Sequence, residues 1–196
     1  MTDTATPPPA GPKLSPAPYW FLRHGETDWN REQRTQGSTE VPLNANGIAQ
    51  AHEAAGLLRD RGINRIFSSP LSRARDTASI VADTLRLNVT VDPELREANF
   101  GTHEGEVMGA WFAAWTEGGV VPEGGESFDQ VQLRAIAALN RVLSKPGLPL
   151  VIAHGGMFRT LRAAMGFTAS VRTQNGVPIH CAPAGIAWTM TPLTRA

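Results

Sequence analysis

Two short apolar runs, far apart in the sequence, both lead into a His-Gly pair. Residues 19–22 continue through Arg23 into His24-Gly25, and residues 149–153 continue into His154-Gly155. Apolar runs of this length are typical of buried strands. Strands with these endings place a cation, imidazole rings and free main-chain N–H groups at one sheet edge. This combination suits a phosphoryl group, and two such endings constrain the chain more than one would.

The rest of the chain alternates strand-like and helix-like segments. A capping box, Ser127 to Gln130, predicts the start of one helix, and Ser69-Pro70 predicts an N-cap with proline at the first helical position. The expected strands are 19–22, 65–67, 89–91, 150–153, 176–181 and 185–191, and the expected helices are 46–61, 70–85, 108–115, 128–143 and 156–165. The alternation predicts an α/β fold, a three-layer αβα sandwich with a mainly parallel central sheet. Ligands of such folds bind at the carboxyl ends of strands, where both His-Gly pairs fall.

Composition limits the function classes. The 196 residues suit one domain, which we place at 19–196, after a proline-rich segment, 1–18, that we expect to be a disordered tail. Zero net charge gives no general attraction to nucleic acid or an acidic membrane. The single cysteine, Cys181, allows no disulfide framework and is expected in the core. The tail lacks an apolar signal region, so we expect a cytoplasmic protein.

Several blocks of sequence resemble the histidine phosphatase (phosphoglycerate mutase-like) superfamily, in the order the family has them. The resemblance covers most of the chain beyond the tail. The matching blocks are 23–30 (RHGETDWN), 42–51, 68–78 (SSPLSRARDTA), 95–105 with Leu95-Arg96-Glu97, 124–127 and His154-Gly155.

The resemblance implies a role for each reacting group. His24 would be the nucleophile and would form a phosphohistidine, which divides one difficult displacement into two easier ones. Arg23 and Arg73 would hold the phosphoryl oxygens. His154, if protonated, would add a third positive group. Glu97 would protonate the leaving oxygen and then activate the attacking water.

Further residues of the resemblance would bind the phosphate without reacting. Asn30 and the main-chain N–H of Gly155 would supply neutral donors, and Gln36-Gly37 matches a loop that touches substrate in relatives. No cofactor and no metal is expected, because the acidic residues are not clustered with further histidines in ligand spacing.

Some residues also allow a purely structural interpretation. Without the other matching blocks, Glu97 would be interpreted as a solvated loop acid and His154 as a core histidine. Only the order of the blocks, which is that of the family, favours a catalytic role. The aromatic residues Trp111, Phe112 and Trp115 are expected mainly in the core or a lid, with a substrate wall as the alternative. His103 replaces an aromatic residue of many relatives, and the sequence leaves its role open.

Charge favours a phosphatase over a mutase. Mutases of this superfamily follow the catalytic Glu with Arg-His-Tyr and hold the substrate carboxylate with cations of a long insertion. Here Ala98-Asn99-Phe100 follows Glu97, and residues 98–133 contain no Lys or Arg but six acids. We expect this segment to form an acidic cover that repels a second anion, and hence a neutral, apolar or cationic leaving group.

The sequence therefore predicts a histidine acid phosphatase-type phosphoric monoester hydrolase that acts on small phosphate monoesters. The alternative is a cofactor-dependent phosphoglycerate mutase. A binding module that has lost catalysis is disfavoured because all five reacting residues are present, and a phosphoprotein phosphatase is weakly disfavoured by the long segment 92–125.

Overall fold

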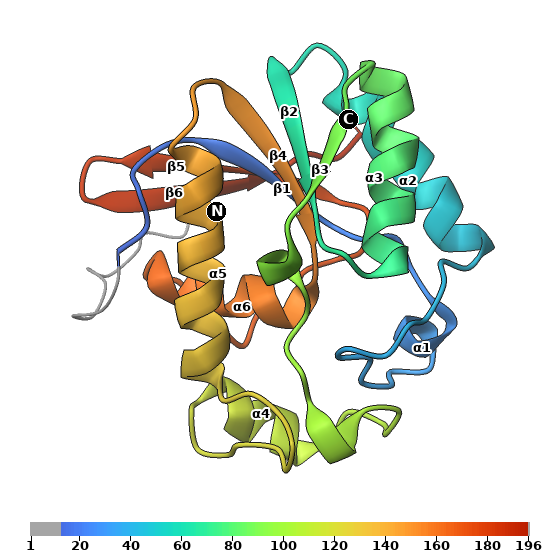
Figure 1. Ribbon diagram of the computed structural model, residues 1–196, viewed down its shortest axis with the longest axis vertical. Coiled ribbons are helices and arrows are strands. Elements are labelled where there is room, and N and C mark those ends of the chain that lie inside the picture. The colour runs from blue at the N-terminus through green and yellow to red at the C-terminus, as the bar shows by residue number, and fades with distance from the viewer. Residues whose placement is uncertain (1–12, 196) are drawn as a thin grey trace.

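A six-stranded mixed sheet forms the centre of the protein, whose computed structural model describes residues 13–195 (Figure 1). The strand order is β3-β2-β4-β1-β5-β6, with β1 to β4 parallel and β5 and β6 antiparallel at one edge. The strands are β1 (Tyr19–Arg23), β2 (Ile63–Ser68), β3 (Val89–Val91), β4 (Leu148–Ala153), β5 (Pro178–Ala184) and β6 (Ala187–Pro192). The predicted α/β fold with a mainly parallel sheet is confirmed.

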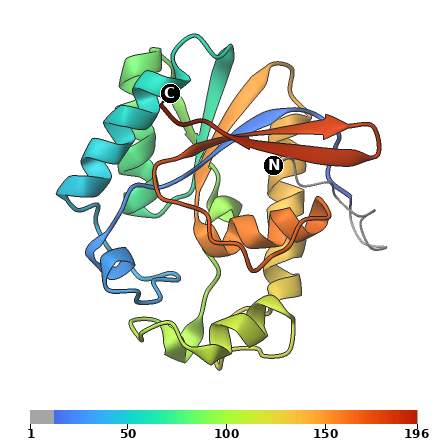
Figure 2. The same cartoon turned by 180° about the vertical axis from the view of Figure 1, so that it is seen from behind.

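Helices cover both faces of the sheet (Figures 1 and 2). The helices are α1 (Asp28–Arg31), α2 (Ala45–Leu58), α3 (Ser72–Leu85), α4 (Ala110–Thr116), α5 (Phe128–Leu143) and α6 (Gly155–Ala164). The central strand β1 alternates between the two layers, since Trp20 and Leu22 pack with α2 and α3 while Tyr19 and Phe21 pack with α5 and α6. Two apolar cores therefore hold the sheet between its helices.

Strand register brings the two His-Gly pairs together. Arg23 pairs with Ala153 at the ends of β1 and β4, and the His24 N–H donates to the Ala153 carbonyl at 3.0 Å. The end of β2 joins them, because the Ser69 N–H donates to the Ile152 carbonyl at 3.0 Å. The segments with α1 and α4 lie beyond this end of the sheet (Figures 1 and 2).

One predicted helix start is wrong. Helix α3 begins at Ser72 with Leu71 as its N-cap residue, not at Ser69-Pro70. The Ser69 hydroxyl accepts from the Leu71 N–H at 3.2 Å and contacts His154, so it closes a turn instead of capping a helix. Residues 24–44, where no helix is expected, also contain a turn of helix, α1, which a Thr27–Asn30 capping box starts.

The first described residues pack on α5. Leu14 is buried, the Ser15 N–H donates to Asn140 Oδ1 at 2.8 Å, and Asn140 Nδ2 donates to the Lys13 carbonyl at 3.0 Å. Residues 13–15, part of the segment that we expect to be a disordered tail, are thus fixed in place by an apolar side chain and an amide. Residues 1–12 of the predicted tail lie outside the described residues.

No helix within residues 13–195 is both long and apolar enough to cross a membrane. The cytoplasmic location stays a prediction.

Candidate active site

His24 follows β1 and is almost completely buried. Its Nδ1 lies 2.7 Å from the Gly25 carbonyl oxygen, which can only accept, so Nδ1 carries the proton and Nε2 the lone pair. Burial, then the charges of Arg73 and Arg23, hold the pKa of His24 well below its usual range. The imidazole is therefore neutral, with one nitrogen available as a nucleophile.

Two buried arginines flank this imidazole. Arg23 Nη1 donates to the Thr173 carbonyl at 2.7 Å, while Arg73 donates to the carbonyls of Thr39 and Gly37, each at 2.8 Å. Burial lowers the pKa of Arg23 to about 10, so it stays charged at neutral pH. The Nε groups of Arg23 and Arg73 have no partner among the described residues. These groups suit an anion beside His24.

His154 lies directly after β4, with its ring centroid 5.1 Å from that of His24. Its Nε2 is 2.6 Å from the Ser69 hydroxyl, and its Nδ1 has no partner within residues 13–195. Burial, followed by Arg73, His24 and Arg23, lowers its pKa well below the usual value. An imidazole buried among cations resists a further charge, so this electrostatic environment disfavours the protonated His154 that the resemblance implies.

Glu97 places its carboxylate at the N-terminus of α6. Its Oε1 accepts from the N–H groups of Ala98 at 2.9 Å and Met157 at 2.7 Å, and its Oε2 accepts from Gly156 at 2.8 Å. A carboxylate has about four acceptor positions, and these bonds fill three. One position remains for a proton, so Glu97 can take up and release a proton without losing its anchors.

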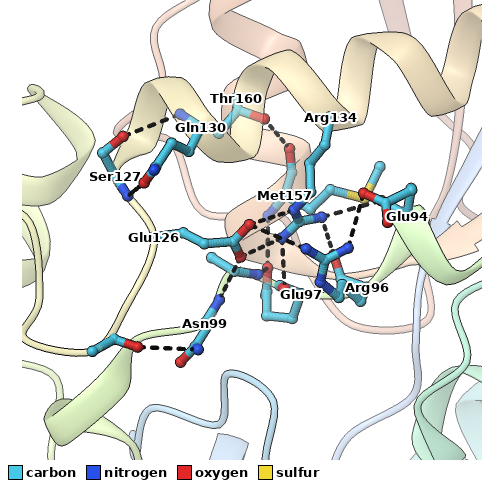
Figure 3. A network of polar contacts seen from close by, with 12 residues as sticks. Glu94, Arg96, Glu97, Asn99, Glu126, Ser127, Gln130, Arg134, Met157 and Thr160 are labelled. Carbon is cyan, nitrogen blue, oxygen red and sulfur yellow. Dashed lines mark hydrogen bonds and ion pairs between the residues drawn. The ribbon is translucent and has the colours of Figure 1, made fainter.

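A partly buried arginine of α5 fixes the main chain around Glu97, as Figure 3 shows. Arg134 donates to the carbonyls of Glu94 at 3.1 Å, Arg96 at 2.9 Å and Glu97 at 2.8 Å. It also makes a two-bond contact with the Glu126 carboxylate at 2.7 and 2.8 Å. These contacts use all the N–H donors of a guanidinium. We name this group the Arg134 clamp.

Sequence reasoning missed the Arg134 clamp, although a signal was present. Arg134 belongs to the same face of α5 as the buried residues Val131, Ala135 and Ala138. A charged side chain within an apolar stripe needs buried partners.

Asn30 and its neighbours form the wall beside His24. Asn30 Oδ1 accepts from the Thr27 N–H at 3.2 Å and from Asn175 Nδ2 at 3.0 Å, which leaves its own Nδ2 as a donor. Asn175 Nδ2 also lies 2.9 Å from the His24 carbonyl. The sequence did not indicate Asn175, because it precedes β5 in no recognisable motif.

Glu104 holds the loop of Gln36 and Gly37. Its carboxylate accepts from the Ser38 and Thr39 N–H groups at 2.7 and 3.0 Å. Gly37 has a positive φ of 54°, and a Cβ there would lie 1.9 Å from Glu104 Oε1. The close approach of Glu104 therefore requires a glycine at this position.

One pocket collects most of the predicted site residues, with His154 buried just behind it. Those that line it are Arg23, His24, Asn30, Gln36, Gly37, Arg73, Glu97 and Gly155. From segment 98–133 the pocket receives only uncharged side chains, Phe100, Met108 and Phe112.

The predicted acidic cover over the pocket is wrong. Glu104 binds loop main chain, Glu106 binds His103 at 2.7 Å, and Glu126 belongs to the Arg134 clamp. The other acids of this segment, Glu117, Glu123 and Asp129, are exposed. No acid of segment 98–133 lines the pocket, whereas Arg34, Arg159 and Arg172 do. The case for a neutral leaving group therefore loses its basis.

The aromatic cluster divides between core and pocket. Trp115 is fully buried and Phe112 lines the pocket, so both alternatives hold in part. His103 stacks on Trp111, with ring centroids 4.1 Å apart. As predicted, Cys181 is buried. Residues 13–195 contain no group of three His, Cys, Asp or Glu side chains arranged to hold a metal ion.

Comparison with known proteins identifies relatives of this site and fold. The profile of the histidine phosphatase superfamily (branch 1) matches residues 19–183. A Yersinia pestis protein named "Probable phosphoglycerate mutase GpmB" is 38% identical over an alignment of 173 residues, and the match covers 82% of this chain and 76% of the relative.

Solved structures give the same result. A mycobacterial glucosyl-3-phosphoglycerate phosphatase in complex with VO3 is 30% identical, with a TM-score of 0.79, and the match covers 92% of this chain and all of the other. A phosphoserine phosphatase mutant from Entamoeba histolytica, in complex with phosphoserine, shares the fold, with 23% identity and a TM-score of 0.77 over 90% of this chain and 96% of the other.

Proposed function

This chain belongs to the histidine phosphatase superfamily, branch 1, and we propose that it is a metal-independent phosphomonoesterase that acts through a phosphohistidine at His24. One observation carries the proposal. The Gly25 carbonyl fixes the His24 tautomer with Nε2 unprotonated, between two buried arginines that each have an unpartnered N–H group among the described residues. A neutral nucleophile beside fixed cations suits attack on a phosphate monoester.

In the first step, His24 Nε2 forms a bond to phosphorus as the bond from phosphorus to the ester oxygen breaks. Glu97, protonated at its remaining acceptor position, gives its proton to the leaving oxygen, and the alcohol departs. Arg23, Arg73 and the Asn30 amide hold the equatorial oxygens. His154 contributes hydrogen bonding to the site, where its Nε2 contacts the Ser69 hydroxyl.

In the second step, Glu97 acts as a base. It removes a proton from water as the water oxygen bonds to phosphorus and the N–P bond breaks. Inorganic phosphate leaves, and both His24 and Glu97 return to their starting protonation. The low pKa of His24 keeps its lone pair free in mildly acidic solution, which fits an acid phosphatase type.

Phosphoglycerate mutase is the second candidate, and the curated relative carries that name. Segment 98–133 offers the pocket no cation, which favours hydrolysis over the mutase pattern of a basic insertion. Arg34, Arg159 and Arg172 line the pocket from elsewhere, however, and could hold the carboxylate of a phosphoglycerate.

Phosphate release from a panel of monoesters in excess EDTA tests the proposal, beside a mutase assay with 3-phosphoglycerate and 2,3-bisphosphoglycerate. We expect release that resists EDTA and disappears in His24→Ala. Mutase turnover faster than phosphate release would establish the alternative, and release that needs a metal would contradict the proposal.

A further inference from the structure

Three arginines, Arg34, Arg159 and Arg172, line the pocket outside the group proposed to bind phosphate. Arg159 projects from α6, four residues after Gly155, and Arg172 lies in the segment that joins α6 to β5. Both share the pocket with His24 and Glu97. Arg23 and Arg73 already supply two guanidinium groups beside His24, so the phosphoryl group does not need Arg159 and Arg172.

Arg159 is held in place. Its Nη1 donates to the Ala169 carbonyl at 2.6 Å, and its guanidinium carbon lies 5.3 Å from the centre of the Phe112 ring. The remaining N–H groups have no hydrogen-bond partner given by the structure within residues 13–195. A guanidinium fixed on an aromatic face presents its free edge with little loss of conformational entropy.

The charges around the pocket are unbalanced. Arg34 lies 3.5 Å from Glu32, which offsets its charge. Neither Arg159 nor Arg172 has an ion pair with a carboxylate among the described residues. Glu97 is the one carboxylate among the residues that line the pocket.

A simple phosphate monoester does not balance these charges. Its dianion would offset Arg23 and Arg73, and the side of Arg159 and Arg172 would keep its positive charge. Burial lowers the pKa of Arg159, the opposing charge of Glu97 raises it, and the like charges of Arg162 and Arg172 lower it further. An added anion would relieve this repulsion.

We propose that Arg159 and Arg172 form a subsite for a second anionic group of the substrate, a carboxylate or a second phosphate. The subsite rests on the proposed function, because it places the second anion on the alcohol that leaves from His24-bound phosphorus. The bond to the Ala169 carbonyl and the Phe112 ring hold the Arg159 guanidinium, and its remaining N–H groups allow a two-bond contact with a carboxylate. The substrate class is thus a phosphorylated acid rather than a neutral phosphate ester.

A matched pair of esters tests this subsite. 3-Phosphoglycerate and glycerol 3-phosphate differ in one position, where a carboxylate replaces a hydroxymethyl group. We expect kcat/KM for 3-phosphoglycerate to exceed that for glycerol 3-phosphate by about 10- to 100-fold, as for one charge-assisted contact. The preference should fall at least fivefold in both Arg159→Gln and Arg172→Gln, and less in Arg159→Lys, which keeps the charge.

Arg75→Gln is the matched control. Arg75 is exposed on α3 and does not line the pocket, so this variant removes the same charge and should keep the preference. Arg172 is also exposed, so Arg172→Gln remains informative if the Arg159 variants fold poorly. An absent preference in the wild type, or a preference that survives in both Gln variants, would overturn the subsite.

Binding of the two esters to His24→Ala, which lacks the proposed nucleophile, tests the subsite independently of the proposed function. We expect calorimetry on this variant to show tighter binding of 3-phosphoglycerate than of glycerol 3-phosphate, and the difference should shrink in Arg172→Gln. Equal binding would overturn the subsite whether or not any ester is hydrolysed. The same comparison between propane-1,3-diol bisphosphate and its monophosphate measures the effect of a second phosphate. It shows whether a carboxylate or a second phosphate increases the binding affinity more.

Discussion

Glu97 Oε2 accepts a hydrogen bond of 2.8 Å from the main-chain N–H of Gly156, the second residue after His154. The proposed acid is thereby anchored to the turn that follows the proposed phosphate ligand. A Cβ on residue 156 would lie 2.7 Å from Glu97 Oε1 and 3.1 Å from Phe100 Cζ. Glycine is required here by the close approach of Glu97.

We therefore expect Gly156→Ala to displace the Glu97 carboxylate. Hydrolysis of alkyl phosphates, which need a proton for the leaving oxygen, should fall by about tenfold or more. Gly56→Ala is the control, because Gly56 is also helical and a Cβ there meets nothing within 4 Å. That variant should keep its activity and gain about 1 kcal/mol in unfolding free energy. Steady-state kinetics in which Gly156→Ala matches the wild type would contradict the anchoring of Glu97.

Glu97→Gln removes the transferable proton while keeping the shape of the side chain. With an alkyl ester both steps should slow, by about 100-fold or more. With 4-nitrophenyl phosphate the first step needs little protonation, so a rapid burst of nitrophenolate should precede a slow second step. Stopped-flow absorbance measures this burst. Equal slowing of both esters without a burst would count against Glu97 as acid and base.

Arg134→Lys tests whether the Arg134 clamp positions Glu97. Lysine offers three donors where arginine offers five, so the main chain of residues 94–97 should loosen. We expect the unfolding free energy to fall by about 1–3 kcal/mol. The alkyl-to-aryl ratio of kcat should also fall, by about threefold to tenfold, because only alkyl esters depend on the proton from Glu97.

Arg141→Lys is the control for this variant, since Arg141 is an exposed residue of the same helix that pairs with Asp92 at 3.0 Å. It should leave the alkyl-to-aryl ratio unchanged. If Arg134→Lys slows hydrolysis of the alkyl and the aryl ester by the same factor, the Arg134 clamp supports the fold but does not position Glu97.

The strand endings are the part of the site that sequence could predict. Arg23, His24 and Gly155 follow directly from parallel strands whose carboxyl ends meet at one sheet edge. Local signals also placed helix α5, because its capping box involves residues close in sequence. The Ser69-Pro70 pattern predicted the wrong start for helix α3, because Ser69 Oγ contacts His154, which is far away in the sequence.

Charge was harder to predict than position. The acids of segment 98–133 are frequent in the sequence, but Glu104 and Glu126 bind main-chain N–H groups and arginine instead of facing the pocket. Arg159 and Arg172 enter the pocket from α6 and the segment after it. Which charged side chains face the pocket depends on tertiary packing, and the composition along the chain does not predict it.

The low pKa values of His24 and His154 predict a pH dependence of stability. The unfolded imidazoles take up protons as the pH falls through about 6.5, whereas the folded ones do not until lower pH. Each should therefore cost about 1.4 kcal/mol of unfolding free energy per pH unit below about 6.5. Urea unfolding between pH 7.5 and 5.5 measures this slope.

Single variants assign the slope. His24→Gln should reduce it by the contribution of one group, and His52→Gln, at an exposed position of α2, is the matched control for loss of an imidazole. If wild type and His24→Gln lose stability equally as the pH falls, His24 is not held neutral by its surroundings.

A search for the phosphoryl group on the protein tests the phosphohistidine mechanism directly. Glu97→Gln, mixed with 4-nitrophenyl phosphate and quenched in alkali to preserve the N–P bond, is digested and its peptides are analysed by mass spectrometry. We predict a phosphoryl group on the peptide that contains His24, and none when His24→Ala is treated in the same way. A phosphoryl group on another residue, or turnover without any on His24, would contradict the account.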